Sequence, residues 1–214
     1  MAEYTFFFNP MSRAQIARWA LHEAGADYEP VLVQWDAKPA ALLAANPLGK
    51  LPTIVHHHQG HDHAVSEAAA VCHYLAEMTA PELLPEAHEK ADYFRMLFFA
   101  AGPLEQATTA QALGWNVEDH QAMVGFGSFD RTMDSLDAWL SAHDYVCGKR
   151  FTMADVYLGS QVMWGLRFGS MPARDSFKAY WDRCSERPAY QKGSAIDNAL
   201  IAEMQTEQSG GDAK

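Results

Sequence analysis

The first 80 residues alternate between the hydrophobic patterns of strands and helices. An aromatic run at residues 4–8, ended by Asn9-Pro10, predicts a buried strand. Apolar residues then recur at helical spacing until Gly25, and residues 28–35 predict a second strand. Because a strand, a helix and a strand follow one another directly, the sequence predicts a parallel, right-handed crossover.

The start of the predicted helix carries a capping pattern. Ser12 and Gln15 match the capping box, in which a serine side chain bonds to the backbone three residues later and the glutamine reaches back. The pattern predicts that Ser12 caps the helix N-terminus. It also places Ser12 at the edge of the sheet where ligands usually bind in such units.

The rest of this half completes one α/β domain. The expected elements are a short helix near residues 39–45, a turn at 46–51, a strand at 53–57, a hairpin across 58–63, a return strand near 64–65 and an alanine-rich helix over 67–78. Pro52 stands at the mouth of a strand, where proline is tolerated. The predicted order of residues 1–80 is therefore β-α-β-α-β-β-α.

The second half shows helical periodicity throughout. The expected helices cover residues 90–113, 118–143, 152–167, a segment around 177–184 and a last one near 194–205. Gly102-Pro103 should kink the first of them, and Thr152 with Asp155 makes a second capping box. The predicted organisation is an α/β domain at 1–80, a linker at 81–88, an all-helical domain at 89–205 and a disordered tail at 206–214.

Charge and composition narrow the classes of partner. A formal net charge of −11 argues against nucleic acid and anionic membranes as partners. The chain has three widely spaced cysteines and no C-x-x-C pair, which favours reduced thiols and a cytoplasmic location. No stretch reaches 18 apolar residues, so no membrane segment is expected.

The turn before the third predicted strand holds a candidate binding feature. Asn46-Pro47-Leu48-Gly49 marks a turn, and the Leu51-Pro52 bond that follows is expected to be cis. A cis bond here would turn the Leu51 N–H and C=O away from the sheet, where they could pair with an extended peptide ligand. An ordinary surface turn into an edge strand is the alternative.

Four motifs together resemble the cytosolic glutathione transferase family, of the bacterial type with serine at the usual activating position. They are Phe8-Asn9-Pro10-Met11-Ser12-Arg13, Asn46-Pro47-Leu48-Gly49-Lys50-Leu51-Pro52-Thr53, Glu67-Ala68-Ala69-Ala70-Val71-Cys72-His73-Tyr74-Leu75 and Phe151-Thr152-Met153-Ala154-Asp155. The resemblance covers nearly the whole chain. It implies a thioredoxin-like N-terminal domain and an all-α C-terminal domain, a detoxifying homodimer, and glutathione bound as co-substrate, with no metal.

The resemblance implies a role for each residue of the glutathione site. Leu51, before the cis Pro52, would hold the cysteinyl part of glutathione through its backbone, and Lys50 would lie near the glycyl carboxylate. Glu67 would meet the γ-glutamyl ammonium. Ala68 stands where the family usually has serine, so only its backbone N–H is left for the γ-glutamyl carboxylate. The neighbouring Ser66 is expected to cap the helix.

Thiol activation is assigned to Ser12 by the same resemblance. Ser12 aligns with the serine of the serine-using classes, Asn9 is the fallback donor, and Phe8 replaces the tyrosine that other classes use. The alternative is that Ser12 only caps its helix, since both roles need the same hydroxyl.

An apolar cleft between the domains would hold the second substrate, a small hydrophobic electrophile. The expected walls are Met11, Phe98, Phe99, Trp164 and Phe168. Peroxide or disulfide reduction with glutathione is an alternative reaction, because it needs the same thiolate. A catalytically silent binding module on the same scaffold is an alternative of another class.

Five histidines between His56 and His63 form a further motif. Imidazole is a common metal ligand, but alternate strand residues point to opposite faces and a hairpin tip is usually solvated. We therefore expect no metal site there.

Overall fold

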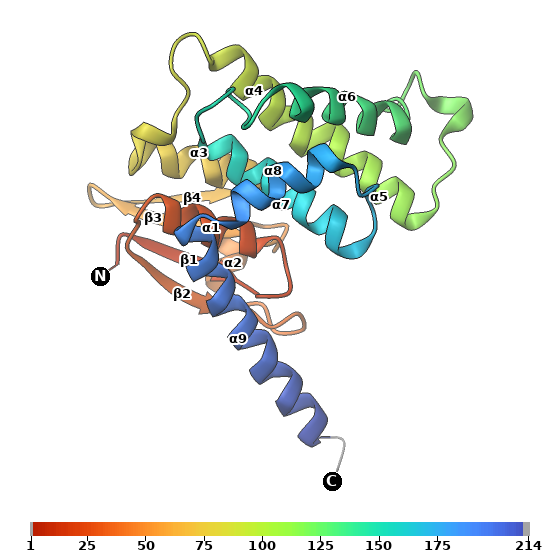
Figure 1. The fold of residues 1–214 in the computed structure, drawn as a ribbon. Coiled ribbons are helices and arrows are strands. Elements are labelled where there is room, and N and C mark those ends of the chain that lie inside the picture. Colours follow the sequence, from red (N-terminus) through yellow and green to blue (C-terminus); the bar gives the residue numbers. More distant parts are fainter. Residues whose placement is uncertain (1, 212–214) are drawn as a thin grey trace. The chain divides into compact units, whose positions relative to one another are not determined.

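The computed structural model describes residues 2–211, which form two compact units (Figure 1). The first unit contains the chain up to Pro81 and again from Arg187, and the second runs from Glu82 to Glu186. The boundary at residues 81 and 82 lies at the start of the predicted linker. The predicted assignment of residues 187–205 to the helical domain differs from the structure, because the last helix packs on the N-terminal unit.

The N-terminal unit is built on a four-stranded mixed sheet. Its strands are β1 (Tyr4–Phe8), β2 (Tyr28–Leu32), β3 (Thr53–His58) and β4 (His61–Ser66). The spatial order is β2-β1-β3-β4, with β1 parallel to β2 and antiparallel to β3. β2 ends at Leu32, three residues before the predicted end, because its partner β1 ends at Phe8, which pairs with Leu32. The predicted parallel pairing of the first two strands is confirmed, and so is the hairpin.

Three helices cover this sheet in the thioredoxin-like order that the sequence predicts: α1 (Ala14–Glu23), α2 (Ala40–Ala45) and α3 (Ala68–Met78). A fourth, α9 (Pro188–Gly211), joins them from the end of the chain. α1 packs against both α3 and α9. The core between helices and sheet holds fully buried aromatic and aliphatic side chains, including Phe6, Ile16, Leu21, Ile54 and Leu75.

The last helix is longer than the sequence suggests. α9 begins at Pro188 instead of near residue 194, and it continues through Gly211, although residues 206–214 are predicted to be disordered. Residues 212–214 lie outside the described part of the chain. Two ion pairs join α9 and its entrance to α1: Arg18 Nε donates to Asp197 Oδ1 at 2.8 Å, and Arg187 Nε donates to Glu23 Oε1 at 2.5 Å.

The second unit is all helical. Its main helices are α4 (Lys90–Phe99), α5 (Glu105–Leu113), α6 (Phe129–Ala142), α7 (Met153–Phe168) and α8 (Asp175–Ser185). A π-helical turn at Ala100–Leu104 joins α4 to α5. Pro103 lies inside this turn and cannot donate a backbone hydrogen bond, which explains why the α-helical pattern is interrupted here.

The predicted helix over residues 118–143 is wrong in its first half. Only one 3₁₀ turn forms at Glu118–His120, and α6 starts at Phe129. Gly127 adopts a left-handed φ of 70°, which ends any helical path, and the side chain of Ser128 then accepts a hydrogen bond from the Arg131 N–H. The apolar spacing of this segment did not reveal the glycine break.

The second predicted capping box is present. Thr152 caps α7, and Asp155 Oδ2 accepts hydrogen bonds from the Thr152 N–H at 2.8 Å and from its hydroxyl at 3.0 Å. The other carboxylate oxygen accepts from the Val146 N–H and the Tyr180 hydroxyl.

Across the described helices, none is long and apolar enough to cross a membrane.

Candidate active site

The strand register gathers the predicted site residues at one end of the sheet. Phe7 near the end of β1 pairs with Thr53 at the start of β3, and Thr53 pairs with Ser66 at the end of β4. The loop after β1, the residues before β3 and the residues after β4 therefore leave the sheet at the same edge. These segments carry Ser12, Lys50, Leu51, Pro52, Glu67 and Ala68.

The Leu51-Pro52 peptide bond is cis, as the sequence predicts. Pro52 is buried and Leu51 is half-buried. Within residues 2–211, no hydrogen bond engages the backbone N–H or C=O of Leu51. This stretch of backbone is consequently available to an extended ligand that pairs with it as a strand would.

Asn46 explains why the turn before this bond has its sequence. Its buried side-chain amide donates to the Lys50 carbonyl at 3.1 Å and to Thr53 Oγ1 at 3.1 Å, while its Oδ1 accepts from the Leu48 N–H. Gly49 has φ of 59°, a conformation that favours glycine. The turn is therefore fixed from both ends and holds the residues before Pro52 in place.

Two lysines lie at this turn, one of which the sequence reasoning missed. Lys50 is exposed, as expected for a group that meets a carboxylate. A Cβ added at Gly49 would lie 3.2 Å from Lys38 Nζ, so the Lys38 side chain crosses the turn beside Gly49. The only sequence signal for this proximity is Gly49 itself, because a glycine can admit another side chain close to the backbone.

The N-terminus of α3 supplies groups of both signs. Glu67 is exposed and has a positive φ of 67°, which is uncommon for a non-glycine residue and recurs at functional positions. Ala68 begins α3, whose first N–H groups point out of the helix toward any anion. The prediction that Ser66 caps this helix is wrong, since Glu67 occupies the cap position and no side chain caps it.

Ser12 lies on the loop between β1 and α1, and its hydroxyl has two internal partners. Ser12 Oγ donates to the Asn9 carbonyl at 2.7 Å and accepts from the Ala14 N–H at 3.1 Å. The predicted capping box is wrong, because Arg13 is the cap residue and the Gln15 amide donates to the Pro10 carbonyl. The half-buried hydroxyl thus lies beside the N-terminus of α1.

Asn9 organises the same loop from inside. It is fully buried, donates to the Val33 carbonyl at 3.0 Å, and accepts from the Met11 N–H at 2.9 Å. Its side chain is therefore engaged by Val33, which follows β2, and by Met11 of the same loop. Phe8 is buried in the core and offers no donor.

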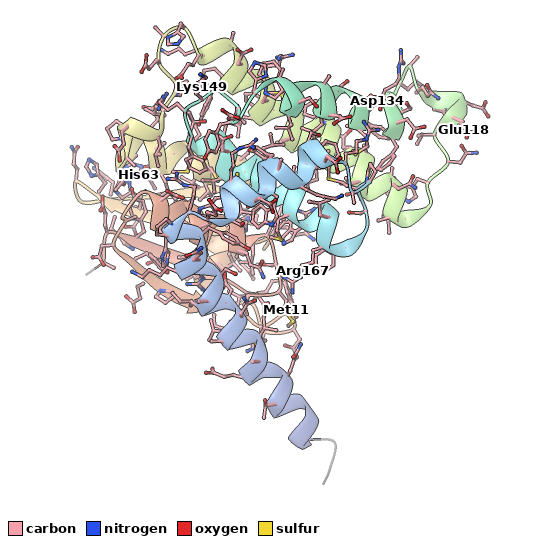
Figure 2. The ribbon with its side chains drawn as sticks, viewed as in Figure 1. Met11, His63, Glu118, Asp134, Lys149 and Arg167 are labelled. Carbon is pink, nitrogen blue, oxygen red and sulfur yellow. The ribbon has the colours of Figure 1, made fainter. Side chains whose placement is uncertain are left out.

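The five predicted wall residues are divided between the two units. Met11 is 46% exposed on the loop next to Ser12 in the N-terminal unit (Figure 2). In the helical unit, Phe98 is 68% exposed and Phe168 is 71% exposed, while Trp164 is half-buried on α7. Phe99 lines a hollow of about 440 Å³ with Pro103, Phe126 and Arg131. Phe98 is not among the residues that line this hollow.

The edge of the sheet has the chemistry to bind a short extended peptide. It presents unpaired backbone at Leu51, ammonium groups at Lys38 and Lys50, a carboxylate at Glu67 and the N-terminus of α3. Such a set suits a ligand with a carboxylate at each end and an ammonium at one of them. Within residues 2–211, no three His, Cys, Asp or Glu side chains are already grouped to hold a metal ion.

Comparisons with known proteins agree with this chemistry. The model of the glutathione S-transferase N-terminal domain matches residues 10–78, and that of the C-terminal domain matches residues 117–188. Glutathione S-transferase 1 of Schizosaccharomyces pombe is 30% identical over 176 residues, which cover 73% of each chain. Glutathione S-transferase 1 of Zea mays is 28% identical over 193 residues, covering 83% of this chain and 88% of the relative.

A solved structure extends the likeness to the fold. The theta class glutathione S-transferase from Xanthomonas axonopodis pv. citri, with glutathione bound, is 26% identical and has a TM-score of 0.68. The match covers 91% of this chain and 98% of that one. The chain belongs to the glutathione S-transferase family. It is a glutathione transferase, and glutathione is its co-substrate.

Proposed function

We propose that this enzyme joins the sulfur of glutathione to an electrophilic carbon of small hydrophobic compounds. The observation that carries the proposal is the edge of the sheet, where backbone, cations, a carboxylate and a helix N-terminus match the groups of one small peptide. In the reaction, the thiolate forms a carbon–sulfur bond, the leaving group departs with the bonding electrons, and the thiol proton passes to solvent.

Each group of glutathione has a partner in this proposal. The backbone of Leu51 pairs with the cysteinyl residue, and Lys50, assisted by Lys38, binds the glycyl carboxylate. Glu67 binds the γ-glutamyl ammonium. The N–H of Ala68 binds the γ-glutamyl carboxylate, aided by the positive end of the α3 dipole.

Ser12 is the proposed activator of the thiol. A free thiol has a pKa near ~8.5, and lowering it by about two units needs roughly 2.7 kcal/mol of preferential binding to the thiolate. A hydroxyl donor and the N-terminus of α1 each contribute about 1 kcal/mol to this preference. The hydroxyl must turn from the Asn9 carbonyl toward sulfur, so thiolate binding replaces one hydrogen bond with a charge-assisted one.

The hydrophobic substrate is proposed to contact Met11, Phe98, Phe99, Trp164 and Phe168. Phe98 and Phe168 are large, apolar and mainly exposed, and Met11 is 46% exposed, so these three side chains are accessible to an apolar ligand. We also propose a homodimer in which the N-terminal unit of one subunit faces the helical unit of the other. Leu48, 71% exposed, is a candidate contact in this dimer.

The three cysteines are free thiols, which supports the proposed cytoplasmic location.

Binding to immobilised glutathione, followed by turnover on a panel of electrophiles and hydroperoxides, tests the function. The proposal predicts retention on the resin and conjugation of aromatic halides or epoxides. Turnover of hydroperoxides alone would favour reduction, and retention without any turnover would favour a silent binding module.

Light scattering tests the dimer, which should have about twice the 23.8 kDa mass of one chain.

A further inference from the structure

The β3–β4 hairpin places four histidines on one face. Its turn consists of Gln59 and Gly60, and the register pairs His58 with His61 and His56 with His63. Residues paired directly across two strands share a face, and so do residues two apart on one strand. The sequence argument that alternation would scatter these histidines is therefore wrong for four of the five. The fifth, His57, pairs with Asp62 on the opposite face.

The four rings are close together but differ in burial and in hydrogen bonding. Ring centres lie 5.0 Å apart for His56 and His58, 6.5 Å for His56 and His63, and 6.4 Å for His61 and His63. His56 is buried, bonded to the Tyr74 hydroxyl at 2.9 Å, and stacked on a tyrosine of β1. His58 is half-buried, while His61 and His63 are exposed. The imidazole rings of these last three make no hydrogen bond to any described residue.

We propose that His58, His61 and His63 bind one divalent transition-metal ion of the Zn²⁺ type. His61-x-His63 presents two imidazoles from one strand, and His58 stands directly opposite His61 on the other strand. Neutral imidazole is a preferred ligand of zinc, nickel and copper, and three such ligands leave one position for water. The high negative charge of the chain, −11, favours the approach of a cation.

The site forms when the ion binds, because the rings must first converge. With zinc–nitrogen bonds of about 2.0–2.1 Å in tetrahedral geometry, the centres of two bound rings lie about 5 Å apart. His61 and His63 are 6.4 Å apart, so they must approach by about 1.4 Å. Exposed side chains change rotamer in picoseconds to nanoseconds, and no hydrogen bond of these rings has to break. Among the described residues, accordingly, no three such side chains are already grouped to hold a metal ion.

The proposed site is separate from the glutathione site. Tyr4 at the start of β1 pairs with His56, so the hairpin tip extends past the N-terminal end of β1, whereas Ser12 follows its C-terminal end. Figure 2 shows His63 and Met11 on opposite sides of the N-terminal unit. Metal binding can therefore be tested independently of catalysis.

Isothermal titration of the 214-residue chain, without an affinity tag, with ZnCl₂ is the direct test. We expect one ion per chain for the natural sequence and no saturable binding for the double variant His61→Gln/His63→Gln. The matched control is His120→Gln, because His120 is an exposed histidine outside the hairpin. It should bind zinc like the natural protein. Circular dichroism without metal should show the same folded structure for all three.

Cobalt supplies a spectroscopic readout of geometry. Co²⁺ bound by three imidazoles and water should give the intense visible absorption of tetrahedral cobalt in the natural protein and in His120→Gln, but not in the double variant. Zinc binding that survives His61→Gln/His63→Gln, or that falls equally in His120→Gln, would overturn the proposal. So would the absence of any saturable binding to the natural protein.

Discussion

The Ser12 hydroxyl donates its proton to the main-chain carbonyl of Asn9 across 2.7 Å, and the same oxygen accepts from the Ala14 N–H. The side chain of Asn9 is buried and bonded on both ends, so this carbonyl is held firmly in place. In this state the hydroxyl stabilises the loop. In the proposed catalytic state it has to rotate and donate to the thiolate, and the two roles can be separated by experiment.

Replacing Ser12 with alanine should raise the pKa of enzyme-bound glutathione and reduce turnover at least about tenfold, equivalent to about 1.4 kcal/mol. The thiolate would lose its hydroxyl donor and keep only the N-terminus of α1. Stability should fall by about 1 kcal/mol, because the loop loses two hydrogen bonds. Difference absorbance of bound thiolate against pH gives the pKa, and steady-state kinetics gives turnover.

Ser128→Ala is the matched control, since Ser128 also accepts a backbone N–H near a helix N-terminus but lies in the other unit. It should lose stability and keep both turnover and thiol pKa. If Ser12→Ala behaves in the same way, Ser12 is only a structural residue of the loop.

Replacing Ala68 with serine should tighten glutathione binding. Ala68 is the first residue of α3, and a hydroxyl there adds a donor for the γ-glutamyl carboxylate beside the backbone N–H. A hydrogen bond to a charged group contributes about 1.5–3 kcal/mol, so KM for glutathione should fall by about tenfold or more. Steady-state kinetics at varied glutathione concentration measures this change.

Ala70→Ser is the control for that gain, because Ala70 is an exposed alanine in the same first turn. An equal fall in KM for both variants would show that serine acts on the helix and not on the ligand.

The N-terminal fold could be predicted because turn residues mark its boundaries. Asn9-Pro10, Gly25 and Pro52 each end or begin an element where the structure has one. The prediction of a helix over residues 118–143 was wrong because it rested on apolar spacing alone. That spacing does not reveal that Gly127 adopts a left-handed φ. Local periodicity also cannot show that α9 packs on α1, since that contact depends on Arg18 meeting Asp197 far along the chain.

The candidate site was less predictable than the fold. The residues at the edge of the sheet follow from motif positions, but Lys38 reaches Gly49 only through tertiary structure. The partner of the Ser12 hydroxyl depends on loop geometry that a capping pattern does not encode. The common face of the histidines depends on a two-residue turn that fixes the strand register.

Replacing Asp155 with alanine should destabilise the helical unit strongly. This buried carboxylate accepts four hydrogen bonds, from two groups of Thr152, the Val146 N–H and the Tyr180 hydroxyl. Truncation would leave buried donors without acceptors, so we expect a loss of about 3 kcal/mol or more. Urea denaturation followed by circular dichroism measures it. Thr152→Ser, which keeps the hydroxyl, should lose much less, and equal losses would contradict this assignment.

Asp197 should make the stability of the natural protein depend on pH. Burial raises its pKa from 3.8 to about 6, and the neighbouring Arg18 opposes this shift only in part. Because the folded chain holds the proton more tightly than the unfolded chain, the stabilisation is fully present below about pH 3.8 and is lost as pH rises through about 6. A shift of this size corresponds to about 3 kcal/mol at most.

Asp197→Asn cannot titrate, so its comparison with the natural protein isolates this carboxyl. Between about pH 3.8 and 6, the window of the shift, the free energy of unfolding of the natural protein should fall relative to that of the variant. Urea titrations of both proteins across this range measure the difference. Asp182→Asn, which removes an exposed aspartate on α8, is the control. It shows how much the loss of a surface carboxylate by itself changes the free energy of unfolding. If the free energy of unfolding of the natural protein instead rises with pH relative to that of Asp197→Asn, the attraction of Arg18 outweighs burial and Asp197 is stabilised as the anion.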